Sequence, residues 1–440
     1  MSHWLLDDEV VPSIHTPLPG PRASEWIARH ERFVSPSYTP IYPLVVARAG
    51  GATVEDVDGN LFLDFTAGIA VNATGHCHPH VTQAIKDQAE KLLHMSGTDF
   101  YYGPQIELAE RLARLGPGGG DWKVFFANSG AEAVEAGLKL ARHHTGRSRV
   151  VAFYGAFHGR TYGAMSLSAS KLVHRRGFGP LLPDVHHAPF PKGCGECWGG
   201  ACACVRAIEE TILKRTAPPD EVAAIFVEPI QGEGGYNVPP RGFLPALRAL
   251  CDKHGMLLVV DEVQSGMGRT GKMFAVEHFA VVPDIICLAK GIASGMPLGA
   301  ILTKAEVMNW PPGSHASTFG GNPVSCRAAL ATLDLLEGGM MANAHERGEQ
   351  LRAGLRALGL ANVRGLGLMT AADVPNRDAV IQWAFQKGLL LLGCGESAIR
   401  FCPPLCLTVQ QVDRAVEILG RVLVERGRSE LEALAILPGR

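Results

Sequence analysis

The chain has 440 residues, of which 47% are apolar and 19% charged, and its 41 Lys and Arg against 43 Asp and Glu leave a net charge of −2. This length predicts more than one packed unit, the apolar content argues against disorder, and the balanced charge argues against an electrostatic nucleic-acid binder. With 51 glycines and 29 prolines, the composition is typical of many strand-to-helix turns and favours an α/β enzyme.

The start of the chain carries Asp7, Asp8 and Glu9 where a secretion signal has basic residues. No apolar run reaches the roughly 18 residues that a membrane-spanning helix needs. We therefore expect no membrane partner and a cytoplasmic location. The eleven cysteines are then expected to be reduced thiols rather than a disulfide framework.

Residues 20–75 predict a hairpin outside the main sheet, with short strands at 52–58 and 61–65 joined by the turn at Gly59. Further along, five short apolar runs alternate with helical patterns, as parallel strands buried on both faces do. These runs are residues 124–126, 150–154, 224–227, 257–260 and 285–288. They predict an α/β fold with a mostly parallel sheet, helices on both of its faces and ligands at the carboxyl ends of its strands.

Near the end of the chain, Thr408 and Gln411 form a capping box that predicts an amphipathic helix on a smaller terminal domain. We therefore expect three regions. They are an N-terminal segment with part of the small domain (1–75), a large ligand-binding domain (76–330) and the C-terminal small domain (331–440).

A first chemical motif lies where residues 125–133, Phe-Phe-Ala-Asn-Ser-Gly-Ala-Glu-Ala, run from a strand into a helix. The small residues Ser129, Gly130 and Ala131 expose backbone N–H groups at the positive end of that helix. This junction predicts a phosphate seat. The alternative is an ordinary tight turn in which Ser129 only caps the helix.

Two charged residues end apolar strands. Asp261 follows Leu-Leu-Val-Val, where a carboxylate at the ligand crevice requires a cationic partner, and Lys290 follows Ile-Ile-Cys-Leu-Ala. A partly buried lysine has a lowered pKa and a nucleophilic amine. A structural ion pair and a surface lysine are the alternatives. Together with the phosphate seat, the two residues match pyridoxal 5′-phosphate (PLP), which has a phosphate, a ring nitrogen and an aldehyde that a lysine holds as a Schiff base.

With these motifs in this order, the sequence resembles the class III PLP-dependent aminotransferases from about residue 21 to 425. That family contains 4-aminobutyrate, ornithine and acetylornithine aminotransferases. The resemblance implies the aspartate-aminotransferase-like fold of type I, with a smaller α+β domain built from both termini. It places cofactor binding on Ser129, Gly130, Ala131, Phe157, His158, Glu228, Asp261, Val263, Gln264, Lys290 and Thr318.

The resemblance also implies individual roles. Lys290 and Asp261 are the expected catalytic residues: Lys290 holds the cofactor and then acts as the base, and Asp261 pairs with the pyridine nitrogen. Phe157 and His158 fall where the family stacks an aromatic ring on the pyridine. Val263 packs under that ring.

Two further positions complete the expected cofactor site. Gln264 reaches the phenolic oxygen, and Thr318 lies in the string 317–323 whose threonine reaches the phosphate of the neighbouring subunit. The resemblance therefore implies a homodimer with shared active sites.

For the substrates, the resemblance implies that Arg400 binds a carboxylate bidentately and that Glu233 pairs with Arg400 when the substrate has no α-carboxylate. Ile69 matches an apolar residue of the substrate pocket, although core packing explains it equally well. An ω-amino or α-amino acid donor and a keto acid such as 2-oxoglutarate would then share one pocket. The alternative is a PLP-dependent racemase or epimerase of the same fold, in which an Asp tends to stand at the position of Glu233.

Two other patterns give weaker indications. Residues 266–271 satisfy the dinucleotide-binding pattern G-x-G-x-x-G, with Asp284 near the offset of a ribose-binding acid. Four cysteines could form a zinc or iron–sulfur site, because four thiolates satisfy tetrahedral coordination. Their spacing is too cramped for a standard zinc knuckle, so a loop of reduced thiols is favoured and we expect no metal. The four cysteines are Cys194, Cys197, Cys202 and Cys204.

Overall fold

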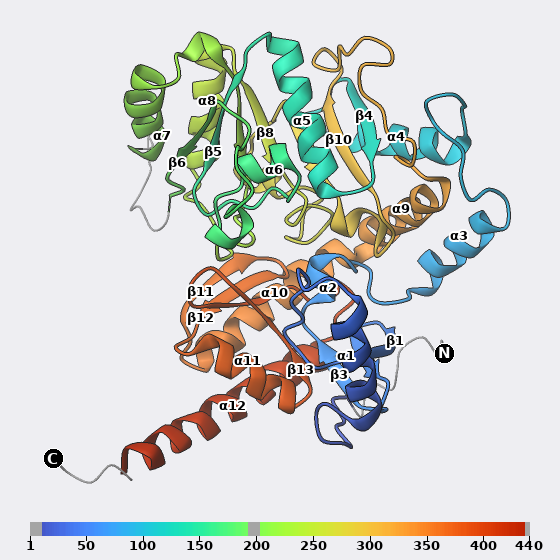
Figure 1. Ribbon diagram of the computed structural model, residues 1–440, viewed down its shortest axis with the longest axis vertical. Helices are drawn as coiled ribbons and strands as arrows, with labels where there is room; N and C mark the ends of the chain where they lie inside the picture. Colours follow the sequence, from blue (N-terminus) through green and yellow to red (C-terminus); the bar gives the residue numbers. More distant parts are fainter. Residues whose placement is uncertain (1–10, 192–202, 436–440) are drawn as a thin grey trace.

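The computed structural model describes residues 11–191 and 203–435, with side chains placed up to residue 425. Figure 1 shows a large upper part around one sheet and a smaller lower part in which segments from near the two ends of the chain lie side by side. This arrangement confirms the predicted fold, a mostly parallel α/β sheet with a smaller α+β part built from both termini. The region boundaries at residues 75 and 330 stay predictions.

The large part contains a seven-stranded sheet in the order β4-β10-β9-β8-β7-β5-β6. The strands are β4 (Trp122–Ala127), β10 (Gly299–Lys304), β9 (Ile285–Leu288), β8 (Leu257–Asp261), β7 (Val222–Val227), β5 (Arg149–Phe153) and β6 (Val185–Ala188). All five predicted strands are present. The sequence pattern missed β6 and also β10, which runs antiparallel to both of its neighbours.

Helices bury both faces of this sheet. On β8, Leu257 and Val259 face the core beneath α5 (Gly130–Thr145) and α6 (Tyr162–Leu167), while Leu258 and Val260 face the core beneath α8 (Phe243–His254). Each strand therefore needs apolar residues at successive positions, which is why the strands appear as continuous apolar runs. The remaining helices of this part are α3 (Pro79–Ala89), α4 (Gly103–Leu115), α7 (Ala203–Ala207) and α9 (Pro323–Leu335).

The smaller part has two four-stranded sheets. The first is β1 (Val46–Gly50), β2 (Thr53–Asp56), β3 (Leu61–Asp64) and β13 (Leu389–Leu390), and the second is β11 (Ala361–Leu366), β12 (Met369–Asp373), β15 (Ala398–Phe401) and β14 (Leu392–Cys394). The predicted hairpin is confirmed as β2 and β3, with Gly59 at φ +90° in its turn. Because β13 pairs in parallel with β3, the two ends of the chain share one sheet.

The remaining helices belong to the smaller part, and short 3₁₀ and π segments occur between the longer elements of both parts. The helices are α1 (Pro21–Phe33), α2 (Ala67–Ala70), α10 (Met341–Ala357), α11 (Arg377–Gln386) and α12 (Val409–Ala435). The short 3₁₀ and π segments are η1 (Leu172–His174), η2 (Ile208–Leu213), η3 (Pro219–Glu221), η4 (Ala275–Phe279), η5 (Lys290–Ala293) and η6 (Leu336–Met340). The capping box of α12 is confirmed, because Gln411 N–H donates to Thr408 Oγ1 at 3.2 Å and Thr408 N–H donates to Gln411 Oε1 at 3.0 Å.

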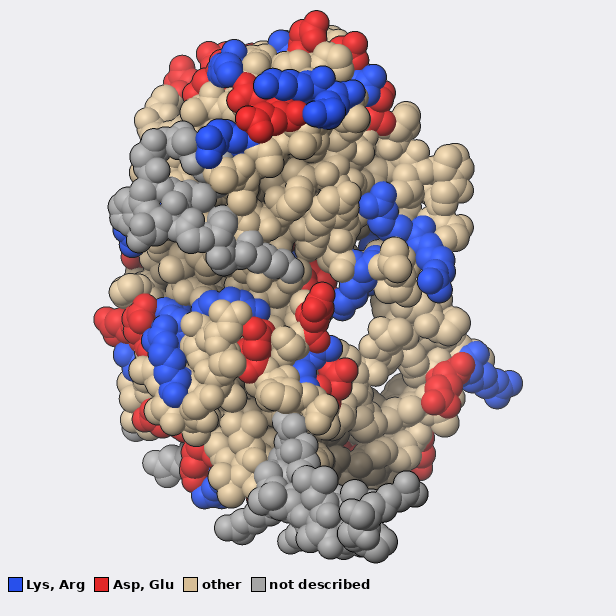
Figure 2. Space-filling model, turned by 90° about the vertical axis from the view of Figure 1, so that its left-hand side faces the viewer, with Lys and Arg blue, Asp and Glu red and all other residues tan. Residues whose placement is uncertain are grey.

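The surface carries no single dominant charge on the face drawn in Figure 2, where Lys and Arg lie among Asp and Glu. Among the described residues, no helix is long and apolar enough to cross a membrane, and no cluster of three or more His, Cys, Asp or Glu could hold a metal. Cys194, Cys197 and Cys202 lie outside the described residues. Residues 266–271 form turns after β8, and no helix begins in them, so the strand-to-helix context of a dinucleotide site is missing.

Candidate active site

The phosphate seat lies at the start of α5, between the ends of β4 and β10. Ser129 caps the helix, because its Oγ accepts a hydrogen bond from Glu132 N–H at 3.2 Å. The first-turn N–H groups of Gly130 and Ala131 have no partner within the helix. A Cβ on Gly130 would stand 2.8 Å from Val263 Cγ1, so only glycine lets the helix start this close to the end of β8. The result is a cradle of backbone donors that fits a phosphate.

Asp261 ends β8 in the middle of the sheet and is buried. Its Oδ2 lies 2.7 Å from Nδ1 of the buried His158, and its Oδ1 accepts a hydrogen bond from Val263 N–H at 3.0 Å. Burial lowers the pKa of His158, but the hydrogen bond and charge of Asp261 outweigh it and raise that pKa above its usual value. The pair therefore fixes the side chain of Asp261 in the wall of the cavity, in a position that suits contact with a ring nitrogen.

Glu228 is a second buried carboxyl group beside this pair. Its two oxygens accept hydrogen bonds from Gly232 N–H at 3.0 Å and Phe157 N–H at 3.2 Å. Burial raises the pKa of Glu228 to about 7. Glu228 thereby holds Phe157 in the wall of the cavity, and its side chain is partly protonated near neutral pH.

Lys290 begins η5, directly after β9, with a φ of +44°. This conformation is unusual for a residue with a side chain, and such backbone strain clusters at functional sites. Within the part of the chain that the structure describes, the Lys290 amine has no hydrogen bond and no ion pair. Burial is the main cause that lowers its pKa. An amine with a lowered pKa and no partner is suited to attack a carbonyl carbon.

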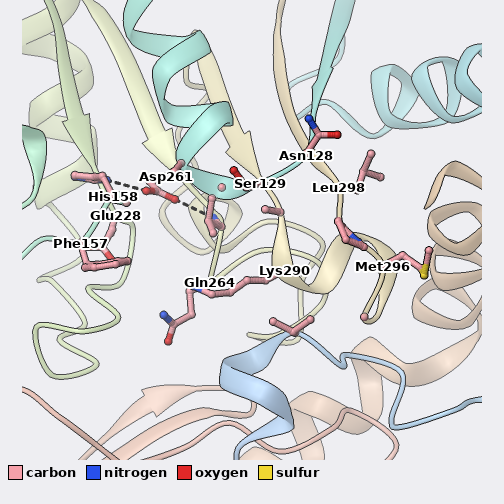
Figure 3. A pocket seen from close by; sticks show the side chains of 18 residues that line it. Asn128, Ser129, Phe157, His158, Glu228, Asp261, Gln264, Lys290, Met296 and Leu298 are labelled. Atoms are coloured by element: carbon pink, nitrogen blue, oxygen red, sulfur yellow. Dashed lines mark hydrogen bonds and ion pairs between the residues drawn. The ribbon is translucent and has the colours of Figure 1, made fainter. Parts of the chain in front are cut away.

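These groups line one cavity of about 350 Å³ (Figure 3). In the figure, Ser129, Asp261 and Lys290 lie near the ends of β4, β8 and β9 and face the same space. Every predicted cofactor-binding residue except Thr318 lines it. Thr318 is exposed on the surface, so its predicted contact with the phosphate of a neighbouring subunit stays a prediction.

The sequence analysis missed several residues of the cavity wall. Asn128 precedes the seat and donates hydrogen bonds from Nδ2 to Glu132 Oε2 at 2.9 Å and to Ser317 Oγ at 3.0 Å. Its position in the seat motif was a usable signal. Residues 295–298 come from the turn between η5 and β10 and carry no local signal, because only the sheet order brings them here. Gln264 is held by Tyr236, whose hydroxyl donates to Gln264 Oε1 at 2.8 Å.

Arg400 and Glu233 meet outside the lining of this cavity, as an ion pair between the two parts of the molecule. Arg400 lies on β15, and its Nη1 stands 3.0 Å from Glu233 Oε2. The Nε of Arg400 is buried and has no hydrogen-bond partner among the residues that the structure describes. The other oxygen of Glu233 stands 2.5 Å from Nζ of Lys171, a residue that the sequence analysis did not single out. Burial raises the pKa of Glu233, but Arg400 and Lys171 outweigh it and hold that pKa below its usual value.

Ile69 belongs to α2, a short turn with left-handed backbone angles. Its φ is +66°, and Ala67, Gly68 and Ala70 also have positive φ values, from +47° to +63°. Three of these residues have a side chain, so the turn stores backbone strain. Ile69 is 43% exposed, which excludes core packing as its explanation.

Comparison with known proteins decides the family. Residues 33–423 match the family model described as aminotransferase class-III. The chain belongs to the class III aminotransferases. It is 41% identical over 398 residues to the acetylornithine aminotransferase of Caldanaerobacter subterraneus, covering 87% of this chain and 95% of that protein. It is also 38% identical to the alanine/serine racemase of Pyrococcus horikoshii, covering 96% of this chain and 94% of that protein.

Among solved structures, the ornithine aminotransferase of Toxoplasma gondii superimposes with a TM-score of 0.84 at 32% identity, over 92% of this chain and 96% of that chain. A second crystal structure of that enzyme has partial occupancy of PLP at the active site. This class III aminotransferase uses PLP as its cofactor. The residues fit the cofactor, because the cavity offers unpaired N–H groups at α5, a buried carboxylate at Asp261 and a buried amine without a partner at Lys290.

Proposed function

We propose that this aminotransferase moves an amino group from an ω-amino or α-amino acid to a keto acid such as 2-oxoglutarate. The ion pair between Glu233 and Arg400 supports this proposal. A guanidinium binds a substrate carboxylate through two parallel hydrogen bonds, which suits a keto acid. When the donor has no carboxylate at that place, Glu233 neutralises Arg400. One pocket can therefore accept both substrates in turn.

The positions of the cofactor-side residues support the roles that we propose for them. Bound PLP supplies an aldehyde that takes up the amino group and a ring that spreads negative charge from the carbon losing its proton. Asp261 holds a proton at the ring nitrogen, and His158 fixes the carboxylate of Asp261 through the 2.7 Å contact. Lys290 would hold the cofactor covalently through its Nζ, and the same amine would move the proton from the substrate carbon. The first turn of α5 holds the phosphate throughout.

We also propose a homodimer in which Thr318 serves the site of the partner. Phe319 is 62% exposed, Tyr101 is 97% exposed and Leu93 is 65% exposed. They lie on neighbouring segments, because Asn322 Nδ2 donates to the carbonyl of Leu93 at 2.9 Å and the hydroxyl of Tyr102 donates to the carbonyl of Gly321 at 2.8 Å. An exposed apolar patch of this kind is typical of an interface. A second copy that covers the patch would lie beside Thr318.

A racemase is the second candidate, since a relative with that name matches most of the chain. The two functions differ in one measurable product. We would incubate the purified enzyme with candidate amines and 2-oxoglutarate, and assay both glutamate formation and inversion of chirality. Glutamate from an ω-amine supports the proposal. Inversion of an amino acid without conversion of PLP to its amine form would overturn it in favour of the racemase.

A further inference from the structure

Glu233 is shared between two cations of very different exposure. Its Oε1 lies 2.5 Å from Lys171 Nζ and its Oε2 lies 3.0 Å from Arg400 Nη1. The side chain of Arg400 is 6% exposed, that of Glu233 17% and that of Lys171 46%. Lys171 lies in the connection between α6 and η1, directly before Leu172. The carboxylate of Glu233 therefore bridges an inner cation and an outer one.

This arrangement bears on how Arg400 becomes available. A substrate carboxylate can bind Arg400 bidentately only after Glu233 has left it. Removing the cation from a mostly buried carboxylate costs free energy, because neither water nor a counter-ion then compensates the charge. Lys171 removes this cost, since it already contacts the other oxygen of Glu233. Its exposed position also gives its long side chain room to follow the carboxylate outwards.

We propose that Lys171 is a positioning residue that receives Glu233 when a substrate carboxylate occupies Arg400. Glu233 turns about its contact with Lys171, and both of its oxygens then face the ammonium group. The proposal rests on the proposed role of Arg400 as the carboxylate anchor and adds the partner that stabilises the open state. Lys171 thereby favours dicarboxylate acceptors over substrates that leave Glu233 on Arg400.

A direct attraction between Lys171 and the ligand is the competing explanation. It would act whether or not residue 233 carries a charge. The two explanations differ in a double-mutant cycle, because a contact through Glu233 disappears when that residue is replaced by glutamine.

The test measures the binding of glutarate, a dicarboxylate without a keto group, to the PLP-loaded enzyme by titration calorimetry. We expect Lys171→Met to weaken binding about 3- to 5-fold, the size of one partly exposed ion pair. Glu233→Gln should tighten binding, because glutarate no longer displaces a carboxylate. In the Glu233→Gln background, Lys171→Met should change binding less than about twofold.

Arg176→Met is the matched control. Arg176 is an exposed cation in the same segment, and no side-chain ion pair or hydrogen bond involves it among the described residues. It should bind glutarate like the wild type, and Lys171→Arg should restore most of the loss. In single turnovers with an ω-amine donor, Lys171→Met should change the half-saturating donor concentration less than it changes glutarate binding, because Glu233 stays on Arg400 in that half-reaction.

Three results would overturn the inference. They are unchanged glutarate binding in Lys171→Met, an equal loss in the presence and absence of the Glu233 charge, and no measurable glutarate binding by the wild type. Glutarate binding needs no turnover. An enzyme that fails to transfer amino groups would therefore overturn the proposed function, while the cycle would still report on Lys171.

Discussion

Lys290 is the nucleophile that we propose for the site. Burial lowers the pKa of its amine, and no other described side chain forms a hydrogen bond or an ion pair with it. We expect borohydride to bleach the visible absorbance of the loaded enzyme and to fix the cofactor on the peptide that contains Lys290. Lys290→Ala should abolish turnover, while the seat at α5 retains part of the cofactor. Peptide mapping checks the assignment, and label on any other lysine would contradict it.

Our proposal assigns to Asp261 the charge that the ring nitrogen requires. Asp261→Asn preserves the shape of the side chain and removes its charge, so folding and cofactor binding should stay largely intact. Proton abstraction should slow by orders of magnitude, since each ~1.4 kcal/mol of lost transition-state stabilisation is a factor of ten in rate. Stopped-flow absorbance in single turnovers measures this step. A near-normal rate would assign the role to another group.

Glu233 and Arg400 should have opposite effects on the two half-reactions. Glu233→Gln should impair donors without an α-carboxylate, because Arg400 then stays uncompensated, and should affect the glutamate half-reaction much less. Arg400→Ala should weaken 2-oxoglutarate by roughly 2 to 4 kcal/mol through loss of a charge-assisted bidentate contact. Cofactor absorbance follows each half-reaction separately. Equal slowing of both by Glu233→Gln would show that the pair is only structural.

At the level of helices and strands, short sequence motifs predicted the helix caps and turns, because contacts between residues close in sequence determine these features. The cap at Ser129 and the hairpin turn at Gly59 are both confirmed. The sequence could not predict β10, because its six residues contain only the short apolar run Ala-Ile-Leu and its antiparallel direction depends on its two neighbours. The hand of α2 was equally hidden, since Ala67 and Ile69 do not ordinarily adopt positive φ.

The contacts of the site also differ in how far the sequence could predict them. Ser129, Asp261 and Lys290 each follow a strand, and strand ends meet at one edge of a parallel sheet, so their meeting was predictable. The contact of Lys171 with Glu233 joins two connecting segments of the chain. No periodicity encodes such a contact.

The capping box of α12 offers a test at this level. Thr408→Ala removes the hydroxyl that accepts from Gln411 N–H and should destabilise the start of the helix by about 1 kcal/mol. Amide hydrogen exchange in the first turn of α12 should then be roughly fivefold faster. Thr408→Ser keeps the acceptor and should exchange like the wild type. Unchanged exchange in Thr408→Ala would show that tertiary packing alone holds this end.

For the whole molecule, the main expectation is a homodimer in which each copy contributes to the active site of the other. Tyr101→Glu places a charge in the exposed apolar patch and should disrupt the dimer, because burying an unpaired carboxylate is costly. Sedimentation should show monomers that lose cofactor more readily. Val424→Glu adds the same charge at another exposed apolar position, 58% exposed on α12, and should leave assembly intact. A Tyr101→Glu protein that stays dimeric would place the interface elsewhere.

The parallel pairing of β3 with β13 also affects folding during synthesis, because β3 leaves the ribosome long before its partner strand does. Leu63 N–H bonds to the carbonyl of Gly388, and Phe65 N–H bonds to that of Leu390. At roughly 5–20 residues per second, about twenty seconds to a minute separates the emergence of these partners. During that time β3 presents an unpaired edge, which is a template for association with other nascent chains. Chaperone demand should therefore fall sharply once residue 390 has left the exit tunnel.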